Sequence, residues 1–235
     1  MRNELSNLEK VSNWYIDEQV DFDKKLIKFR YRTWKSRLVG PRGLELGPAE
    51  GVMTKYLLDD FESLTVVDAA SNLINRIPDA PNLLKVHSLF EDFEPKEKFN
   101  SIILEHILEH VEDPVALLRR AKDWLLPKGK LYLGVPNGSS FHRLVAVHMG
   151  FLESKCQLNE RDLKQGHRRV YTFETFRKDI ESSGLKIDEM GGVFFKPLSN
   201  SQIDRDWTNE MIEGFYQLGN EFPENAADIF CVCTN

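Results

Sequence analysis

The chain has 235 residues, of which 41% are hydrophobic and 29% are charged. This length and composition are typical of one globular domain with a well-buried core, so we expect a single domain over residues 1–235. The formal net charge of −6 argues against nucleic acid as the main partner, because phosphate binding draws on clustered Lys and Arg.

The first elements predicted along the chain are helical. Residues 1–38 are rich in charged and aromatic side chains, and Phe22, Leu26 and Phe29 recur at roughly helical intervals, which predicts an N-terminal helical cap. From Arg42 onward, apolar runs alternate with amphipathic stretches. The expected strands are 43–46, 64–68, 83–87, 101–104, 130–135, 185–189 and 229–234. The expected helices are 52–58, 114–126, 173–183 and 209–219.

The alternation of strands and helices predicts the fold class. It implies right-handed crossovers and therefore an α/β fold with a doubly wound, parallel sheet. The helix at 114–126 is the best marked, because Asp113 can cap it and Pro114 suits its first turn. We expect a ligand-binding core at 39–136, an insertion over the sheet edge at 137–172, and a C-terminal helix and strands at 173–235.

The cysteine content and the length of the apolar runs indicate where in the cell the protein is located. Cys156, Cys231 and Cys233 are too few for a disulfide framework, which favours the reducing cytoplasm. Cys231 and Cys233 lie on one face of a predicted strand, where free cysteine packs as a small hydrophobe rather than binding metal. The start has no signal-peptide core and no apolar run reaches membrane-spanning length, so we expect no membrane insertion.

The most informative motif follows the first predicted strand, where a turn reads Glu45-Leu46-Gly47-Pro48-Ala49-Glu50-Gly51. Glycine at such a turn lets the backbone approach a ligand closely, and the small Ala49 preserves most of that clearance. A dinucleotide fold would have G-x-G-x-x-G here, with a loop that receives a pyrophosphate. The carboxylates of Glu45 and Glu50 would repel a pyrophosphate, so they favour a cationic ligand.

A second carboxylate ends the next predicted strand. Asp68 follows Gly47 by about 20 residues, the spacing at which a carboxylate can accept both hydroxyls of an adenosine ribose. We therefore interpret the turn and Asp68 together as a nucleoside site.

Together with further segments, these residues resemble the class I, Rossmann-like, S-adenosylmethionine-dependent methyltransferases, in particular their small-molecule branch. The resemblance is carried by Glu45–Gly51, Val67-Asp68, Phe99–His106, Leu108–Pro114 and Leu126–Leu131. It covers residues 42–136 closely and the rest by topology. The chain departs from the family at Ala49, where glycine is frequent.

The resemblance implies a seven-stranded, mostly parallel sheet whose last strand is antiparallel, with N-terminal helices and an insertion after the fifth strand. It also implies S-adenosylmethionine as the cofactor. Glu45 would orient the amino group of its methionine part, Asp68 would hold the ribose, and Glu105 and His106 would face the methionine end and the substrate. The implied cofactor-binding residues are Glu45, Gly47, Pro48, Ala49, Gly51, Asp68, Ala69, Ser88, Leu89, Phe90 and Glu105.

Candidate catalytic residues are histidines, because histidine is the usual base near neutral pH. His106 lies at the strand end that faces the substrate in the family, and His167 begins a basic turn, so we take both as catalytic candidates. His110 would orient its loop or act in catalysis, His87 would pack, and His142 would belong to a solvated face or a pocket wall.

The basic turn containing His167 allows two interpretations. It is an exposed turn, or it is a loop that recognises an anionic substrate, because guanidinium groups bind phosphate and carboxylate bidentately. The substrate-binding residues predicted from the second interpretation and from the family are His106, His167, Arg168, Arg169 and Tyr171. No metal site is expected.

We expect an O- or N-methyltransferase acting on a polar, anionic small molecule, such as a nucleotide-linked or phosphorylated sugar or amine. A weaker resemblance of the basic loop is to bacterial methyltransferases of surface-polysaccharide and other small-metabolite pathways. The alternatives are an RNA or protein side-chain methyltransferase, a cofactor-binding protein without transfer activity, and, more distantly, a nicotinamide dehydrogenase. A homo-oligomer is compatible with the sequence.

Overall fold

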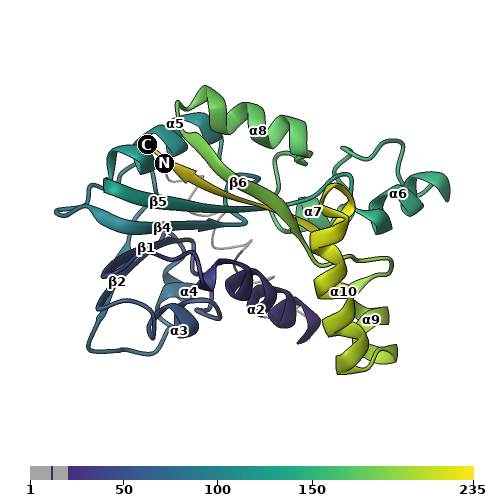
Figure 1. Cartoon of the computed structure of the whole chain (residues 1–235), viewed down its shortest axis with the longest axis horizontal. Coiled ribbons are helices and arrows are strands. Elements are labelled where there is room, and N and C mark those ends of the chain that lie inside the picture. The colour runs from purple at the N-terminus through teal and green to yellow at the C-terminus, as the bar shows by residue number, and fades with distance from the viewer. Residues whose placement is uncertain (1–11, 13–20) are drawn as a thin grey trace.

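The computed structural model describes residue 12 and residues 21–235, and it shows one seven-stranded sheet with helices on both faces (Figure 1). The first part of the predicted cap, residues 1–11 and 13–20, lies outside the described residues. Its described part is residue 12 and residues 21–38, of which Asp21–Lys35 form α2. The strands are β1 Arg42–Leu46, β2 Ser63–Asp68, β3 Leu83–His87, β4 Phe99–Glu105, β5 Leu125–Pro136, β6 Lys186–Val193 and β7 Asp228–Thr234.

The sheet has the strand order β3-β2-β1-β4-β5-β7-β6. Neighbouring strands from β3 to β5 pair in parallel, whereas β7 pairs antiparallel with both β5 and β6. The predicted α/β fold, with a mostly parallel sheet and an antiparallel last strand, is confirmed.

Two apolar cores lie on the two faces of this sheet. Successive residues of a strand point to opposite faces, so Ile102 and Leu104 enter one core while Ile103 enters the other. Because helices cover both faces, the central strands are largely apolar, with the buried Glu45 on β1 and Ser101 on β4 as exceptions. Cys231 and Cys233 are free, fully buried and part of the first core, as the packing interpretation predicts.

The helices divide between the two faces, with α5 and α8 on one side and α2, α3 and α4 on the other (Figure 1). Asp113 caps α5 as predicted, through a 2.9 Å hydrogen bond from the Ala116 amide. The helix ends at Asp123, earlier than expected, because the chain enters β5 at Leu125. The remaining helices are α3 Thr54–Leu57, α4 Ser71–Ile74, α5 Pro114–Asp123, α6 Phe141–His148, α7 Glu160–Lys164, α8 Phe173–Ser182, α9 Asn200–Asp206, α10 Asn209–Glu221 and the 3-10 helix η1 Pro223–Asn225.

The insertion after β5 carries α6 and α7 and is held together by one buried arginine. The guanidinium of Arg143 donates to the backbone oxygens of Lys155 and Gln157, and it pairs with Asp162 at 3.0 Å. None of the helices in the described part of the chain combines the length and the apolar character that a bilayer crossing needs.

Candidate active site

A cavity of about 450 Å³ lies at the carboxyl edge of the parallel strands, where α/β sheets bind their ligands. Its walls come from the strand ends, α2, the insertion and the segment around Lys196. The same cavity contacts both groups of residues that the sequence assigned to cofactor and to substrate. The predicted cofactor residues that line it are Glu45, Gly47, Pro48, Ala49, Asp68, Phe90 and Glu105. Gly51, Ala69, Ser88 and Leu89 do not line it and stay predictions.

The turn after β1 has the strained backbone that its glycines suggest. Gly47, Ala49 and Gly51 all have positive φ values, of 66°, 47° and 82°. A Cβ atom on Gly47 would lie 2.2 Å from Cδ1 of Ile107, and the positive φ would strain any side chain there even if Ile107 moved away. Ala49 takes the left-handed conformation that costs a residue with a side chain roughly 1–2 kcal/mol, which explains why the family frequently has glycine at this position.

Glu45 is buried below this turn and accepts a 2.6 Å hydrogen bond from the hydroxyl of Thr54. Burial raises the pKa of Glu45 to about 7. Among the described residues no basic nitrogen lies within 4.0 Å of its carboxylate. A buried carboxylate that lacks a cation suits a cationic ligand group, such as an ammonium.

Asp68 ends β2 on the far side of the turn. Its Oδ1 accepts a 2.8 Å hydrogen bond from the Ala70 amide, which holds the carboxylate at the cavity wall. Burial raises the pKa of Asp68 to about 6, against the lowering effect of backbone amides. Glu45, Gly47 and Asp68 thus fit the amino group, the close backbone approach and the ribose of the expected cofactor.

An ion network lies where β4 ends. Arg30 reaches in from α2, pairs with Glu105 and donates a 2.8 Å hydrogen bond to Asp228, which begins β7. Gly134 on β5 leaves room for Glu105, because a Cβ atom at that position would lie 2.0 Å from Oε2 of Glu105. Sequence reasoning missed Arg30 and Asp228.

His106 joins this network with an unusual backbone. Its φ of 53° turns the imidazole so that Nε2 lies 3.4 Å from both Glu105 and Asp228. Burial and Arg30 oppose the imidazolium, but the two carboxylates outweigh them and raise the pKa of His106. A raised pKa favours the imidazolium form, which has no free lone pair for a proton, so the geometry favours a charged partner over a base.

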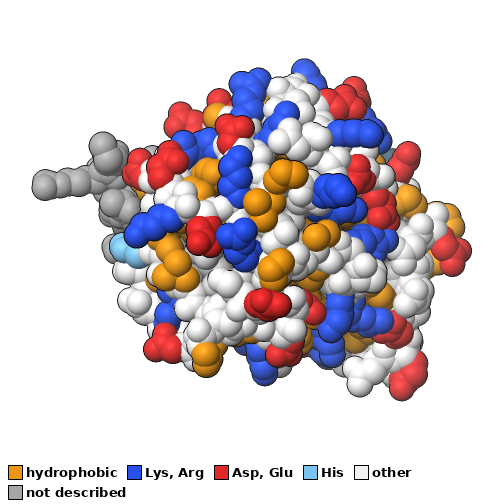
Figure 2. All heavy atoms as spheres, turned by 60° about the vertical axis from the view of Figure 1, so that its left-hand side comes forward, with side chains coloured by type: hydrophobic (Ala, Val, Ile, Leu, Met, Phe, Trp, Pro, Cys, Tyr) orange, Lys and Arg blue, Asp and Glu red, His pale blue; other side chains and the backbone are white. Residues whose placement is uncertain are grey.

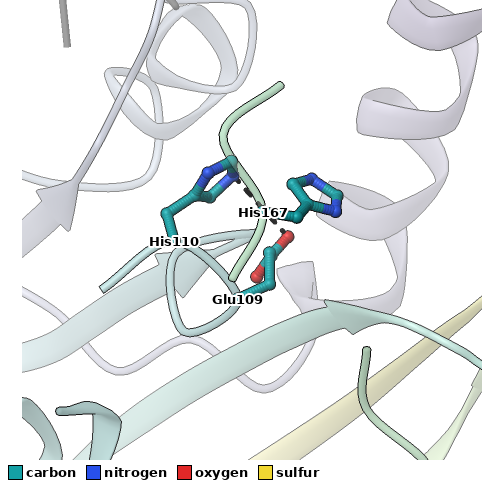
Figure 3. A group of neighbouring side chains, drawn as sticks. All are labelled: Glu109, His110 and His167. Atoms are coloured by element: carbon teal, nitrogen blue, oxygen red, sulfur yellow. Dashed lines mark ion pairs between the residues drawn. The ribbon is translucent and has the colours of Figure 1, made fainter. Parts of the chain in front are cut away.

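His167 and His110 meet at the other side of the cavity. Their rings pack edge to face with centroids 4.7 Å apart, and burial lowers the pKa of each to about 3. Glu109 lies beside them, 1% exposed, and burial raises its pKa to about 7. Figure 3 shows its carboxylate pointing toward the two rings. Glu109 was not among the predicted site residues.

The basic turn after His167 is built into the loop that follows β4. Arg169 donates hydrogen bonds to the backbone oxygens of Leu108 at 2.6 Å, Val111 at 2.5 Å and Glu112 at 3.0 Å. The hydroxyl of the buried Tyr171 donates to Asp179 at 2.9 Å. Of the predicted substrate residues, His106, His167 and Arg169 line the cavity, whereas Arg168 and Tyr171 do not.

The cavity also holds basic side chains that the sequence analysis left unassigned. Lys196 lines it, and its Nζ donates a 2.9 Å hydrogen bond to Oδ1 of Asn200. Burial lowers the pKa of Lys196 to about 8 and that of the neighbouring His142 to about 2. His142 is thus part of the pocket wall. The expectation that His87 packs is wrong, because its ring is exposed and lies 2.9 Å from the Ala69 carbonyl.

The chain matches known proteins over most of its length. A family model described as a methyltransferase domain matches residues 16–190. A ubiquinone biosynthesis O-methyltransferase of Xanthomonas euvesicatoria pv. vesicatoria (strain 85-10) is 24% identical over 194 residues, which are 74% of each chain. A second protein of that name, from Haemophilus ducreyi, is 24% identical over 236 aligned residues, covering 91% of this chain and 94% of that one.

Solved structures share the fold. The S-adenosylmethionine-dependent methyltransferase of Mesorhizobium loti superposes with a TM-score of 0.63 at 14% identity, over 88% of this chain and 98% of that one. The N-methyltransferase NodS of Bradyrhizobium japonicum WM9, in complex with S-adenosyl-L-homocysteine, superposes with a TM-score of 0.60 at 18% identity, over 98% and 96% of the two chains.

Proposed function

The chain belongs to the class I S-adenosylmethionine-dependent methyltransferases of small molecules, and from that premise we propose that its acceptor is polar and carries an anionic group. When bound, S-adenosylmethionine supplies a methyl group activated by a sulfonium. Glu45 and Asp68 would hold its amino group and its ribose. The remaining residues of the cavity must hold the acceptor in line with that methyl group.

The observation that carries this proposal is the pairing of the basic side chains in the cavity wall. The guanidinium groups of Arg30 and Arg143 are each paired with a carboxylate, Asp228 and Asp162 respectively. Lys196 instead donates to the neutral amide of Asn200, and no described carboxylate lies within 4.0 Å of its Nζ. Its charge is therefore available to an acceptor, and a charge-assisted hydrogen bond in such a site is strong.

The acceptor atom is an oxygen or a nitrogen, and a phosphorylated or nucleotide-linked sugar or amine carries the required charge. The relatives named above include enzymes of both kinds, O-methyltransferases and an N-methyltransferase. We assign His106 the task of orienting the acceptor, because its charge is tied to Glu105 and Asp228. On the face that Figure 2 shows, Lys and Arg alternate with Asp and Glu, so that face presents no basic track for RNA.

Paired acceptors test this proposal. Phenols and amino sugars are compared with their carboxylated or phosphorylated counterparts, and transfer of labelled methyl from S-adenosylmethionine is measured. We expect the anionic member of a productive pair to have at least a tenfold higher kcat/KM, the effect of about 1.4 kcal/mol. In Lys196→Gln this preference shrinks, chiefly through KM, whereas Lys164→Gln on the exposed side of α7 keeps it. Equal or better use of the neutral members contradicts the proposal.

A further inference from the structure

We propose that Glu109, His110 and His167 bind a divalent transition-metal ion of the Zn²⁺ class at the acceptor end of the cavity. The sequence predicted no metal site. It concerns a different group of side chains from those that hold the cofactor, and its role toward the acceptor rests on the proposed function.

The geometry of the three side chains carries the proposal. One potential ligand atom from each residue lies within 4.8 Å of the other two. Around a tetrahedral Zn²⁺ with bonds of about 2.1 Å, the ligand atoms lie about 3.4 Å apart. A side-chain movement of about 1 Å would therefore close the site. Glu109 and His110 come from the loop after β4, and His167 comes from the segment before α8, so the fold itself assembles the group (Figure 3).

The state of Glu109 is a second, independent observation. Its side chain is 1% exposed, and neither carboxylate oxygen has a hydrogen-bond partner among the described residues. The nearest imidazole nitrogens, on His106 and His110, lie 3.7 Å and 3.9 Å from Oε1, which is too far for a hydrogen bond. A buried carboxylate without hydrogen bonds is costly, and the imidazole of His106 at 3.7 Å offsets only part of that cost. A bound cation would lower the cost further.

The surroundings hold the three residues in place, as the outer shell of a metal site does. Oδ1 of Asp162 lies 3.6 Å from Nδ1 of His167, which is within ion-pair range but beyond hydrogen-bond length. Asp162 therefore lies on the Nδ1 side of the ring, and we expect Nε2 to be the metal ligand. Asp162 is fixed in turn by Arg143 and by the capping box of α7. On the other side, Arg169 fastens the loop of Glu109 and His110 through three backbone oxygens.

This arrangement gives the basic turn of the sequence a role. The turn around His167 supplies one ligand, and Arg169 positions the other two. In this proposal the turn forms part of the metal site. Its Arg169 guanidinium binds backbone oxygens, whereas the sequence suggested that it binds an anionic substrate.

The ligand types select the metal. Two imidazoles and one carboxylate are typical of Zn²⁺ and of Fe²⁺ or Mn²⁺, whereas Mg²⁺ and Ca²⁺ prefer oxygen ligands alone. Three protein ligands leave a coordination position open. Because His110 and His167 both line the cavity, we expect that position to face the acceptor, where it would bind an oxygen of the anionic group.

Metal binding is tested without any acceptor. Protein without affinity-tag histidines is stripped with a chelator and titrated calorimetrically with Zn²⁺, and with Mg²⁺ for comparison. We expect one equivalent of Zn²⁺ and a weaker response to Mg²⁺. The isosteric Glu109→Gln and the variant His167→Ala should weaken Zn²⁺ binding at least about 100-fold, more than the loss of an outer-shell group does.

His148→Ala is the matched control, because this histidine lies exposed at the end of α6 and should bind Zn²⁺ as the natural chain does. Circular dichroism confirms that each variant is folded, and Glu109→Gln preserves the shape of the side chain if His167→Ala does not fold. Absence of a stoichiometric Zn²⁺ site, or equal Zn²⁺ affinity in Glu109→Gln, overturns the proposal.

The role toward the acceptor has its own measurement. With a productive acceptor, Zn²⁺ should lower KM for the acceptor and leave the affinity for S-adenosylmethionine unchanged. Binding of Zn²⁺ with no change in KM would keep the site and overturn its contact with the acceptor. A preference for neutral acceptors would contradict the proposed function while the calorimetric result on Zn²⁺ still stood.

Discussion

Glu45 and Asp68 both line the cavity, at the end where we expect the cofactor to bind. Burial raises the pKa of both, to about 7 and about 6. The charged form of each is the one that can accept from an ammonium or from ribose hydroxyls. Because a raised pKa means that each carboxyl binds a proton at lower acidity, cofactor binding at mildly acidic pH must displace those protons.

We therefore predict that the affinity for S-adenosylmethionine falls as pH is lowered from 8 to 5. The fall begins near pH 7 with Glu45 and steepens below pH 6 with Asp68, by about tenfold per pH unit for each protonated carboxyl. Calorimetric titrations across this range measure it. The variant Asp68→Asn should bind S-adenosylmethionine weakly even at pH 8, and its affinity should no longer fall more steeply below pH 6. The control Glu62→Gln, on the exposed turn before β2, should show the same dependence of affinity on pH as the unchanged chain. An affinity that is the same at pH 5 and pH 8 contradicts both assignments.

The sequence predicted these two carboxylates because each lies next to a local signal, a glycine turn or a strand end. Arg30 had a signal as well, since it lies on the apolar face of α2 between Leu26 and Trp34 at helical spacing. A charged side chain on a buried helix face is costly unless it is paired with an opposite charge, so Arg30 could have indicated a buried carboxylate partner. Lys196 had no such signal, because it lies in an irregular segment whose place is set by distant contacts.

At the scale of elements, α2 contributes to the site through one buried ion network. Removing Arg30 would leave the two buried carboxylates of Glu105 and Asp228 with His106 as their one remaining described cationic partner. Breaking a buried pair in this way costs about 3–5 kcal/mol, whereas an exposed pair contributes about 1 kcal/mol or less.

Two substitutions on α2 allow the loss of a buried ion pair to be compared with the loss of an exposed one. We predict that Arg30→Met lowers the free energy of unfolding by about 3–5 kcal/mol. Arg32→Met, which removes an exposed pair with Glu213, should lower it by no more than about 1 kcal/mol. Urea unfolding of both proteins provides the measurement. Equal losses in the two variants would show that Arg30 is not the cation that the buried carboxylates require.

The insertion shows why some elements escaped prediction. The core strands have apolar residues facing both cores, so their runs are visible in the sequence. The short α7 and α9 have few apolar residues, and their N-terminal capping hydrogen bonds involve common polar residues. Arg143 fixes the insertion through contacts with residues 155–162, and these tertiary contacts determine the arrangement more than local pattern does.

At the scale of the whole molecule, the sheet divides the apolar interior into two cores, and the cavity lies at its carboxyl edge. The cofactor half of the cavity is formed by loops directly after β1 and β2, so the sequence predicted most of it. The acceptor half joins α2, the loop after β4, the insertion and the segment around Lys196. Side chains from such distant segments meet only in the folded chain, which is why Glu109 and Lys196 were missed.

The central claim is that this cavity takes a sulfonium nucleoside rather than a pyrophosphate dinucleotide. Calorimetric titration of the chain with S-adenosylmethionine and, separately, with NAD⁺ tests it most directly. The carboxylates of Glu45 and Asp68 predict a one-to-one complex with S-adenosylmethionine, at least about 100-fold weaker in Asp68→Ala because two charge-assisted hydrogen bonds are lost. The carboxylates of Glu45 and Glu50 would repel a pyrophosphate and therefore predict no binding of NAD⁺. Binding of NAD⁺, or no binding of S-adenosylmethionine by the natural chain, would contradict the claim.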